Sequence, residues 1–345
     1  MSRWEPDVLP GYWQCTFALG PDPDGEGELE ATLVRRGDAD PSARHAVLMV
    51  HGFTDYFFNT EIAAHFAARG FAFYAIDLHK CGRSHRRGQT PHFTTDLARY
   101  DVELERALDV IAAVSGPQVL VYGHSAGGLV VSLWLDRLRA RRSTARKGVG
   151  GLVLNAPWLD LQGHAILRTP PTSAALMAMR RFRKHSVIRR PVSEGGYGST
   201  LHRDFAGEFD YNLEWKPVGG FPVTFGWIHA IRRGQAKLHR GLDVGVPNLI
   251  LRSDHSVREV ADPALIQKGD AVLEVSQIAR WAGCIGNRTT IVPIADAKHD
   301  VFLSLPEPRR RAYDELDRWL DWYLSEATGA PGATASPSEG STGHG

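Results

Sequence analysis

Metal-binding and disulfide patterns are absent from this sequence. Its three cysteines, Cys15, Cys81 and Cys284, are widely and irregularly spaced, and no Cys-x-x-Cys pair occurs. Neither a disulfide framework nor a thiolate zinc site is therefore predicted. The histidines form neither a His-x-x-x-His nor a His-Glu-x-x-His pattern, so we expect no metal and no cofactor.

The sequence also lacks an excess of one charge and a long apolar run. It has 40 Lys and Arg against 39 Asp and Glu, so nucleic acid is not an expected partner. No apolar stretch of about 18 residues is present, which argues against stable insertion into a membrane. Residues 1–14 lack the pattern of a secretory signal, so a cytoplasmic location is the default expectation. Nothing in the sequence indicates an oligomeric state.

Short apolar runs of strand length alternate with longer segments of helical periodicity. The predicted strands are 46–50, 71–77, 118–123, 151–157, 247–253 and 289–294, and the predicted helices are 60–69, 96–114, 127–140, 275–284 and 307–325. Near-continuous apolar strands are typical of a parallel sheet that is covered on both faces. Residues 12–19 and 27–36 alternate like an antiparallel pair. We therefore predict an α/β fold whose mostly parallel central sheet has an antiparallel N-terminal edge.

The alternation stops between residues 161 and 245, which contain no obvious sheet strand. An insertion after a parallel strand lies over the sheet edge where such folds bind ligands, so 161–245 is predicted to be a cap. Residues 1–160 and 246–325 then form the core, and 326–345 a disordered tail. A basic helical pattern at 173–190 indicates a packed cap helix or, alternatively, peripheral contact with anionic lipid.

One serine stands where a nucleophile is expected. The stretch GHSAG, residues 123–127, follows a predicted strand and precedes a predicted helix. In that setting Gly-x-Ser-x-Gly forms a sharp turn that lifts Ser125 above the sheet edge. The glycines are needed because the strand and the helix crowd the turn. A serine hydroxyl becomes a good nucleophile only when a base accepts its proton, so a histidine must lie nearby in space.

The base and the acid are expected later in the chain, in the order serine, acid, histidine. His299 lies in the loop after the last predicted strand, from which it can reach Ser125. Two aspartates are candidates for the acid: Asp254 directly ends the strand 247–253, whereas Asp270 follows a further loop. The shorter stretch from Asp270 to His299 leaves room for one helix and one strand, so Asp270 is favoured and Asp254 stays open.

An acyl-transfer site also needs donors for the negative charge that develops on the substrate oxygen. The backbone N–H of Ala126, the residue after the serine, is one expected donor. The other is expected in the loop after the strand 46–50, where His51-Gly52 precedes Phe53. The N–H of Phe53 is therefore the second candidate.

These motifs resemble the α/β-hydrolase superfamily. The resemblance rests on GHSAG, on His51-Gly52, on DLHKCGRSHRRG at 77–88 and on KHDVFLS around His299. Within the superfamily the sequence is similar to the branch of monoacylglycerol lipases, lysophospholipases and serine aminopeptidases. The resemblance covers residues 12–325 and is weakest in the cap. It departs from the family pattern at 254–268, which look like an extra loop.

The resemblance implies hydrolysis of a small-molecule acyl ester through an acyl-enzyme on Ser125, with Asp270 and His299 as its partners. An aminopeptidase or amidase on the same residues is an alternative, in which the cap carboxylates hold a substrate amine. Those carboxylates are Glu208, Asp210 and Glu214. A ligand-binding protein that reuses the fold without catalysis is a third possibility.

Overall fold

The computed structural model describes residues 3–115, 118–142, 147–161, 183–188, 196–257 and 262–328. These residues form a sheet of nine strands in the order β1-β2-β3-β5-β4-β6-β7-β8-β9. The strands are β1 (Glu5–Pro6), β2 (Tyr12–Pro21), β3 (Glu28–Arg36), β4 (His45–Val50), β5 (Phe71–Asp77), β6 (Gln118–His124), β7 (Val149–Asn155), β8 (Asn248–Ser253) and β9 (Thr289–Ile294).

The sheet is antiparallel from β1 to β5 and parallel from β5 to β9. Strands β1, β2, β3 and β5 pair antiparallel in that order. Strand β4 pairs parallel with both β5 and β6, and β6 to β9 continue the parallel part. The predicted α/β fold with an antiparallel N-terminal edge is confirmed. Only the short strand β1 was not predicted.

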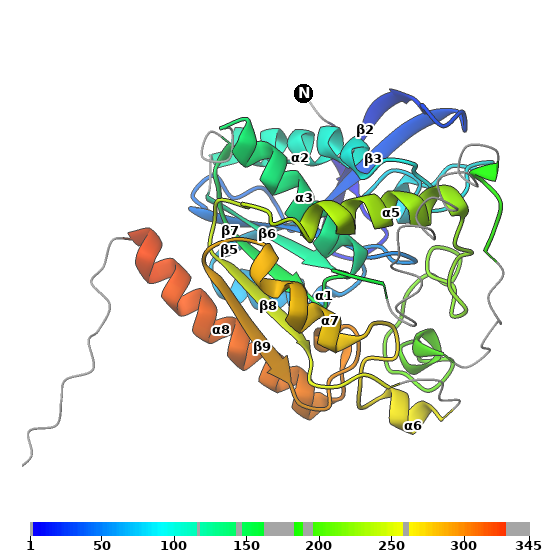
Figure 1. Cartoon of the computed structure of the whole chain (residues 1–345). Coiled ribbons are helices and arrows are strands. Elements are labelled where there is room, and N and C mark those ends of the chain that lie inside the picture. The colour runs from blue at the N-terminus through cyan, green and yellow to red at the C-terminus, as the bar shows by residue number, and fades with distance from the viewer. Residues whose placement is uncertain are drawn as a thin grey trace, which may run out of the picture.

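Helices cover both faces of this sheet (Figure 1). The helices are α1 (Thr60–Ala68), α2 (Tyr100–Ser115), α3 (Ala126–Ala140), α5 (Phe225–Leu238), α6 (Pro263–Ile266), α7 (Val275–Trp281) and α8 (Pro306–Thr328). Helices α1 and α8 share one buried apolar cluster with the sheet, and α2, α3, α5 and α7 share the other. In α8 the buried residues Ala312, Leu316, Leu320 and Tyr323 recur at helical spacing, which directs one side of the helix to the sheet.

Helix α5 lies within the range predicted as cap, where no helix was expected at these residues. Its N-cap is Thr224, whose side chain accepts a hydrogen bond from the Trp227 N–H. Its Gly234 faces α3 closely, because a Cβ there would lie 2.8 Å from Leu133 Cδ1. The packing of α5 against α3 attaches this part of the insertion to the helical layer. The limits of the cap at 161 and 245 stay a prediction.

Two predicted segments lie mainly outside the described residues. Of the predicted helix at 173–190 only 183–188 are described, and of the predicted tail only 326–328, which end α8. None of the three cysteines takes part in a disulfide. No helix among the described residues combines the length and apolar character needed to cross a membrane.

Candidate active site

Ser125 occupies a strained turn between β6 and α3. Its φ of +52° and ψ of −119° are rarely adopted by a residue with a side chain. The glycines on either side permit this turn: a Cβ on Gly123 would lie 2.6 Å from Val131 Cγ2, and one on Gly127 would lie 2.2 Å from the His51 oxygen. Because three backbone segments meet here, GHSAG needs both glycines.

Replacing Gly127 by alanine is expected to lower the free energy of unfolding by about 3 kcal/mol, because the new methyl group meets the His51 carbonyl in a packed site. Urea denaturation measures this loss. Gly283→Ala is the matched control, since its Cβ would have no neighbour within 4 Å. We expect that change to stay within about 0.5 kcal/mol of the original protein. Equal stability of the two variants would contradict the packing described for the turn.

His299 joins Ser125 to a buried carboxylate. Its Nε2 lies 3.0 Å from Ser125 Oγ, and its Nδ1 lies 2.9 Å from Asp270 Oδ2. The other carboxylate oxygen, Asp270 Oδ1, accepts hydrogen bonds from the N–H groups of Val272 at 2.8 Å and Leu273 at 2.7 Å. An ionised carboxylate only accepts hydrogen bonds, so Nδ1 carries the proton and Nε2 is free to accept from the serine hydroxyl.

The structure brings Asp270, and not Asp254, to His299. Asp254 follows β8, but its side chain is 40% exposed, and its Oδ1 contacts His255 Nδ1 at 2.8 Å and the Asp296 N–H at 3.1 Å. After β8 the chain makes an excursion that includes α6 and then returns. Asp270 forms a parallel bridge with Ser256, three residues beyond the end of the strand. The extra loop therefore returns Asp270 to the end of β8, close to His299. The side chain of Asp254, although it directly follows the strand, is exposed and does not contact His299.

Of the two predicted backbone donors, Ala126 directly follows Ser125, and Phe53 follows a glycine that lies against the serine. Ala126 begins α3, and the N–H groups in the first turn of a helix have no acceptor within the helix. Phe53 follows Gly52, and a Cβ on Gly52 would lie 3.0 Å from Ser125 Cβ. The imidazole of His51 fixes this loop: its Nδ1 donates to the Gly52 carbonyl at 2.7 Å, and its Nε2 accepts from the Leu78 N–H at 3.1 Å.

A group of packed aromatic side chains lies near the serine turn. The Phe53 ring packs on Trp227 with ring centroids 4.0 Å apart and on His92 at 5.2 Å. Trp227 in turn packs on Trp158 at 5.5 Å. The backbone of Trp158 donates to the Ser125 carbonyl at 2.9 Å, which ties this aromatic group to the turn.

A second imidazole lies against His299. The rings of His124 and His299 are 5.0 Å apart, and His124 Nδ1 is 3.0 Å from the Asn155 carbonyl. Burial lowers the pKa of His124. A neutral His124 does not repel the positive charge that His299 acquires when it takes a proton. Lys298, also buried, donates to the Thr200 carbonyl at 3.0 Å, and burial lowers its pKa to about 8.

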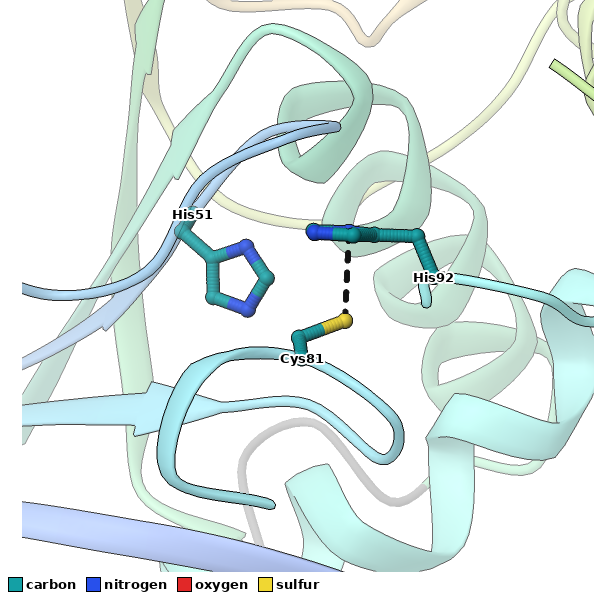
Figure 2. A group of neighbouring side chains, drawn as sticks. All are labelled: His51, Cys81 and His92. Carbon is teal, nitrogen blue, oxygen red and sulfur yellow. Dashed lines mark hydrogen bonds between the residues drawn. The ribbon is translucent and has the colours of Figure 1, made fainter. Parts of the chain in front are cut away.

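One buried group of described residues has donor atoms close enough to hold a metal ion. Figure 2 shows His51, Cys81 and His92, whose donor atoms lie within 4.8 Å of one another. His92 Nδ1 is 3.2 Å from Cys81 Sγ. Burial raises the pKa of the Cys81 thiol and lowers the pKa of His92, and both nitrogens of His51 already bind backbone groups. These contacts favour a neutral thiol beside neutral imidazoles over the thiolate that a metal requires.

The sequence matches the family model described as serine aminopeptidase, S33, over residues 41–264. Among solved structures, a soluble variant of the monoglyceride lipase from Saccharomyces cerevisiae in complex with a substrate analogue is 17% identical, with a TM-score of 0.60 over 89% of this chain and 96% of that one. A monoacylglycerol lipase from Paleococcus ferrophilus is 16% identical, with a TM-score of 0.57 over 90% and 99%. No curated protein sequence gives a significant match. These similarities show a shared fold.

Proposed function

Because the chain belongs to the serine aminopeptidase, S33, family of α/β-hydrolases, we propose that it is a serine hydrolase that cleaves carboxylic esters through an acyl-enzyme. One observation carries the proposal: His299 Nε2 lies 3.0 Å from Ser125 Oγ, while its Nδ1 lies 2.9 Å from Asp270. A hydroxyl on a strained turn, a base within hydrogen-bonding distance and a carboxylate behind the base are the parts that such a reaction needs.

In the first half of the reaction, Ser125 Oγ attacks the ester carbonyl carbon while His299 Nε2 accepts the hydroxyl proton. The buried carboxylate of Asp270 stabilises the imidazolium that results. The N–H groups of Phe53 and Ala126 stabilise the oxyanion. When the tetrahedral intermediate collapses, the bond to the leaving alcohol breaks, and the alcohol oxygen takes the proton from His299.

In the second half, water releases the acid. His299 Nε2 accepts a proton from the water as its oxygen attacks the acyl carbon. The second tetrahedral intermediate breaks the bond to Ser125 Oγ, which takes the proton back from His299. The products are a carboxylic acid and the original enzyme, so the step needs no cofactor.

The substrate that we propose is a small acyl ester of the monoacylglycerol or lysophospholipid type. The packed aromatic rings of Phe53, Trp227 and Trp158 make the surroundings of the serine turn apolar, which suits an acyl chain better than a charged substrate. An aminopeptidase would need a free carboxylate for the substrate amine. Two of the cap carboxylates instead pair with arginines, Glu208 with Arg309 and Asp210 with Arg203.

A substrate panel distinguishes these activities. It contains p-nitrophenyl esters, monoacylglycerols, lysophospholipids and aminoacyl anilides. We expect turnover of the esters, with complete inactivation by a fluorophosphonate. Turnover of anilides alone would favour the aminopeptidase. Binding of a panel member with neither turnover nor inactivation would favour a ligand-binding protein. The cytoplasmic location and a contact of the basic cap residues with anionic lipid stay predictions.

A further inference from the structure

The loop that follows Phe53 is held by a distant part of the chain. Three consecutive loop residues each contact the segment 212–221, which precedes α5. The contacts are Phe221 N–H to Thr54 Oγ1 at 2.9 Å, Lys216 Nζ to Asp55 Oδ1 at 2.6 Å and Asn212 N–H to Tyr56 Oη at 2.7 Å. The three residues that directly follow Phe53, the proposed oxyanion donor, are therefore each held by this segment.

The central contact is an ion pair buried in the protein. Lys216 and Asp55 are each 7% exposed. Burial alone would raise the pKa of Asp55, but the ammonium group of Lys216 beside it lowers the pKa to about 2. The carboxylate therefore stays ionised near neutral pH. Without Lys216 it would be a buried charge with no formal counterion, which is strongly destabilising for the loop that carries it.

Asp55 also contacts the backbone of the loop that carries it. Its second oxygen, Oδ2, lies 3.4 Å from the Gly52 nitrogen, which donates to it. Gly52 and Phe53 share a peptide bond, so an orientation fixed at Gly52 limits where the Phe53 N–H points. The contacts therefore run from Lys216 through Asp55 to Gly52, which lies against Ser125.

The stretch 197–221 also contacts the loop of His299. Tyr211 packs on Phe58 with ring centroids 4.8 Å apart, in a buried cluster that includes Leu303 from the 3-10 helix η7 (Val301–Leu303). The Tyr197 hydroxyl accepts a hydrogen bond from the Asp300 N–H at 3.0 Å, next to His299. The same stretch of chain therefore touches the loops that carry the base and the second oxyanion donor.

We propose that Lys216 is a positioning residue for the oxyanion site: through Asp55 it holds the loop in the conformation that directs the Phe53 N–H at the substrate oxygen. This inference rests on the proposed ester hydrolysis. Lys216 acts through Asp55 and does not itself touch the reacting atoms. The segment 212–221 thus helps to fix the position of the second oxyanion donor.

The test compares Lys216→Met with Lys216→Arg and measures kcat and KM for a p-nitrophenyl ester. We expect Lys216→Met to lower kcat about 100-fold, the effect of losing one oxyanion donor, with KM changed less than about threefold. Its affinity for a trifluoromethyl ketone, which forms an oxyanion on Ser125, should fall by a similar factor. Lys216→Arg keeps the charge and should recover most of the loss.

Two further variants separate positioning from folding. Tyr56→Phe removes only the hydroxyl that binds the 212–221 segment and is expected to fold, with kcat lowered about fivefold. Arg203→Met removes an exposed ion pair with Asp210 and serves as the control, with unchanged kinetics. The inference is overturned if Lys216→Met keeps the original kcat, or if its loss lies in KM while ketone affinity is unchanged. If Lys216→Met does not fold, an unchanged kcat in Tyr56→Phe overturns it. An inactive original protein would instead refute the proposed function.

Discussion

Replacing Ser125 by alanine is expected to reduce kcat for a p-nitrophenyl ester about 10⁶-fold, the size of loss that follows removal of the nucleophile in a serine hydrolase. Alanine at this position has a Cβ and adopts the same strained φ, so the turn keeps its geometry. Only the oxygen that His299 contacts at 3.0 Å is lost. Stopped-flow or end-point release of p-nitrophenol measures the effect. The free energy of unfolding should change by less than about 1 kcal/mol.

Ser132 provides a matched control on the neighbouring helix. It is also a buried serine, and its Oγ donates to the Gly128 carbonyl at 2.7 Å within α3. Ser132→Ala should retain kcat within about threefold, because this hydrogen bond is local to the helix. Comparable losses in the two variants would indicate a general sensitivity of α3 and would remove the support for Ser125 as the nucleophile.

Replacing Asp270 by asparagine is expected to reduce kcat about 10⁴-fold, the size of loss that follows a wrong histidine tautomer. The reason lies in the two N–H groups, from Val272 and Leu273, that donate to Oδ1. They require the amide oxygen of the asparagine to remain on their side. The amide NH₂ then faces His299 Nδ1, so the histidine proton moves to Nε2, which can no longer accept from Ser125.

Asp254→Asn tests the other candidate acid under the same assay. Asp254 is partly exposed and contacts His255 and Asp296, so we expect kcat within about threefold of the original protein. A larger loss in Asp254→Asn than in Asp270→Asn would reverse the assignment. Equal large losses would show that the whole 254–270 loop, and not one carboxylate, determines activity.

The sheet was predictable because its strands carry strong local signals. The run QVLVYG before Ser125 is apolar, of strand length and followed by glycine-rich turn residues, and β6 forms there at Gln118–His124. The two acidic candidates were harder to separate. The strand end favoured Asp254, whereas the spacing to His299 and the family resemblance favoured Asp270. The return of the chain to pair Asp270 with Ser256 is a tertiary contact that no local pattern encodes.

The contacts that hold the loop after Phe53 could not be predicted in this way. Asp55 and Lys216 are separated by 161 positions and belong to no recognisable motif. A lysine in a polar, aromatic-rich segment is expected on the surface, because lysine is seldom buried unless it is paired, and the sequence does not show its partner. The cluster of His51, Cys81 and His92 escapes sequence patterns for the same reason, because His51 follows β4 whereas Cys81 and His92 lie in the connection after β5.

The central claim is that His299 activates Ser125 as a nucleophile. Its most direct test is the rate and site of phosphonylation by a fluorophosphonate, measured in the original protein and in His299→Ala. The reagent traps an activated hydroxyl and is not turned over, so peptide mass spectrometry locates the adduct. We expect modification of Ser125 alone, at a rate that falls at least about 1000-fold in His299→Ala. An adduct on another residue, or an unchanged rate without the imidazole, would contradict the account.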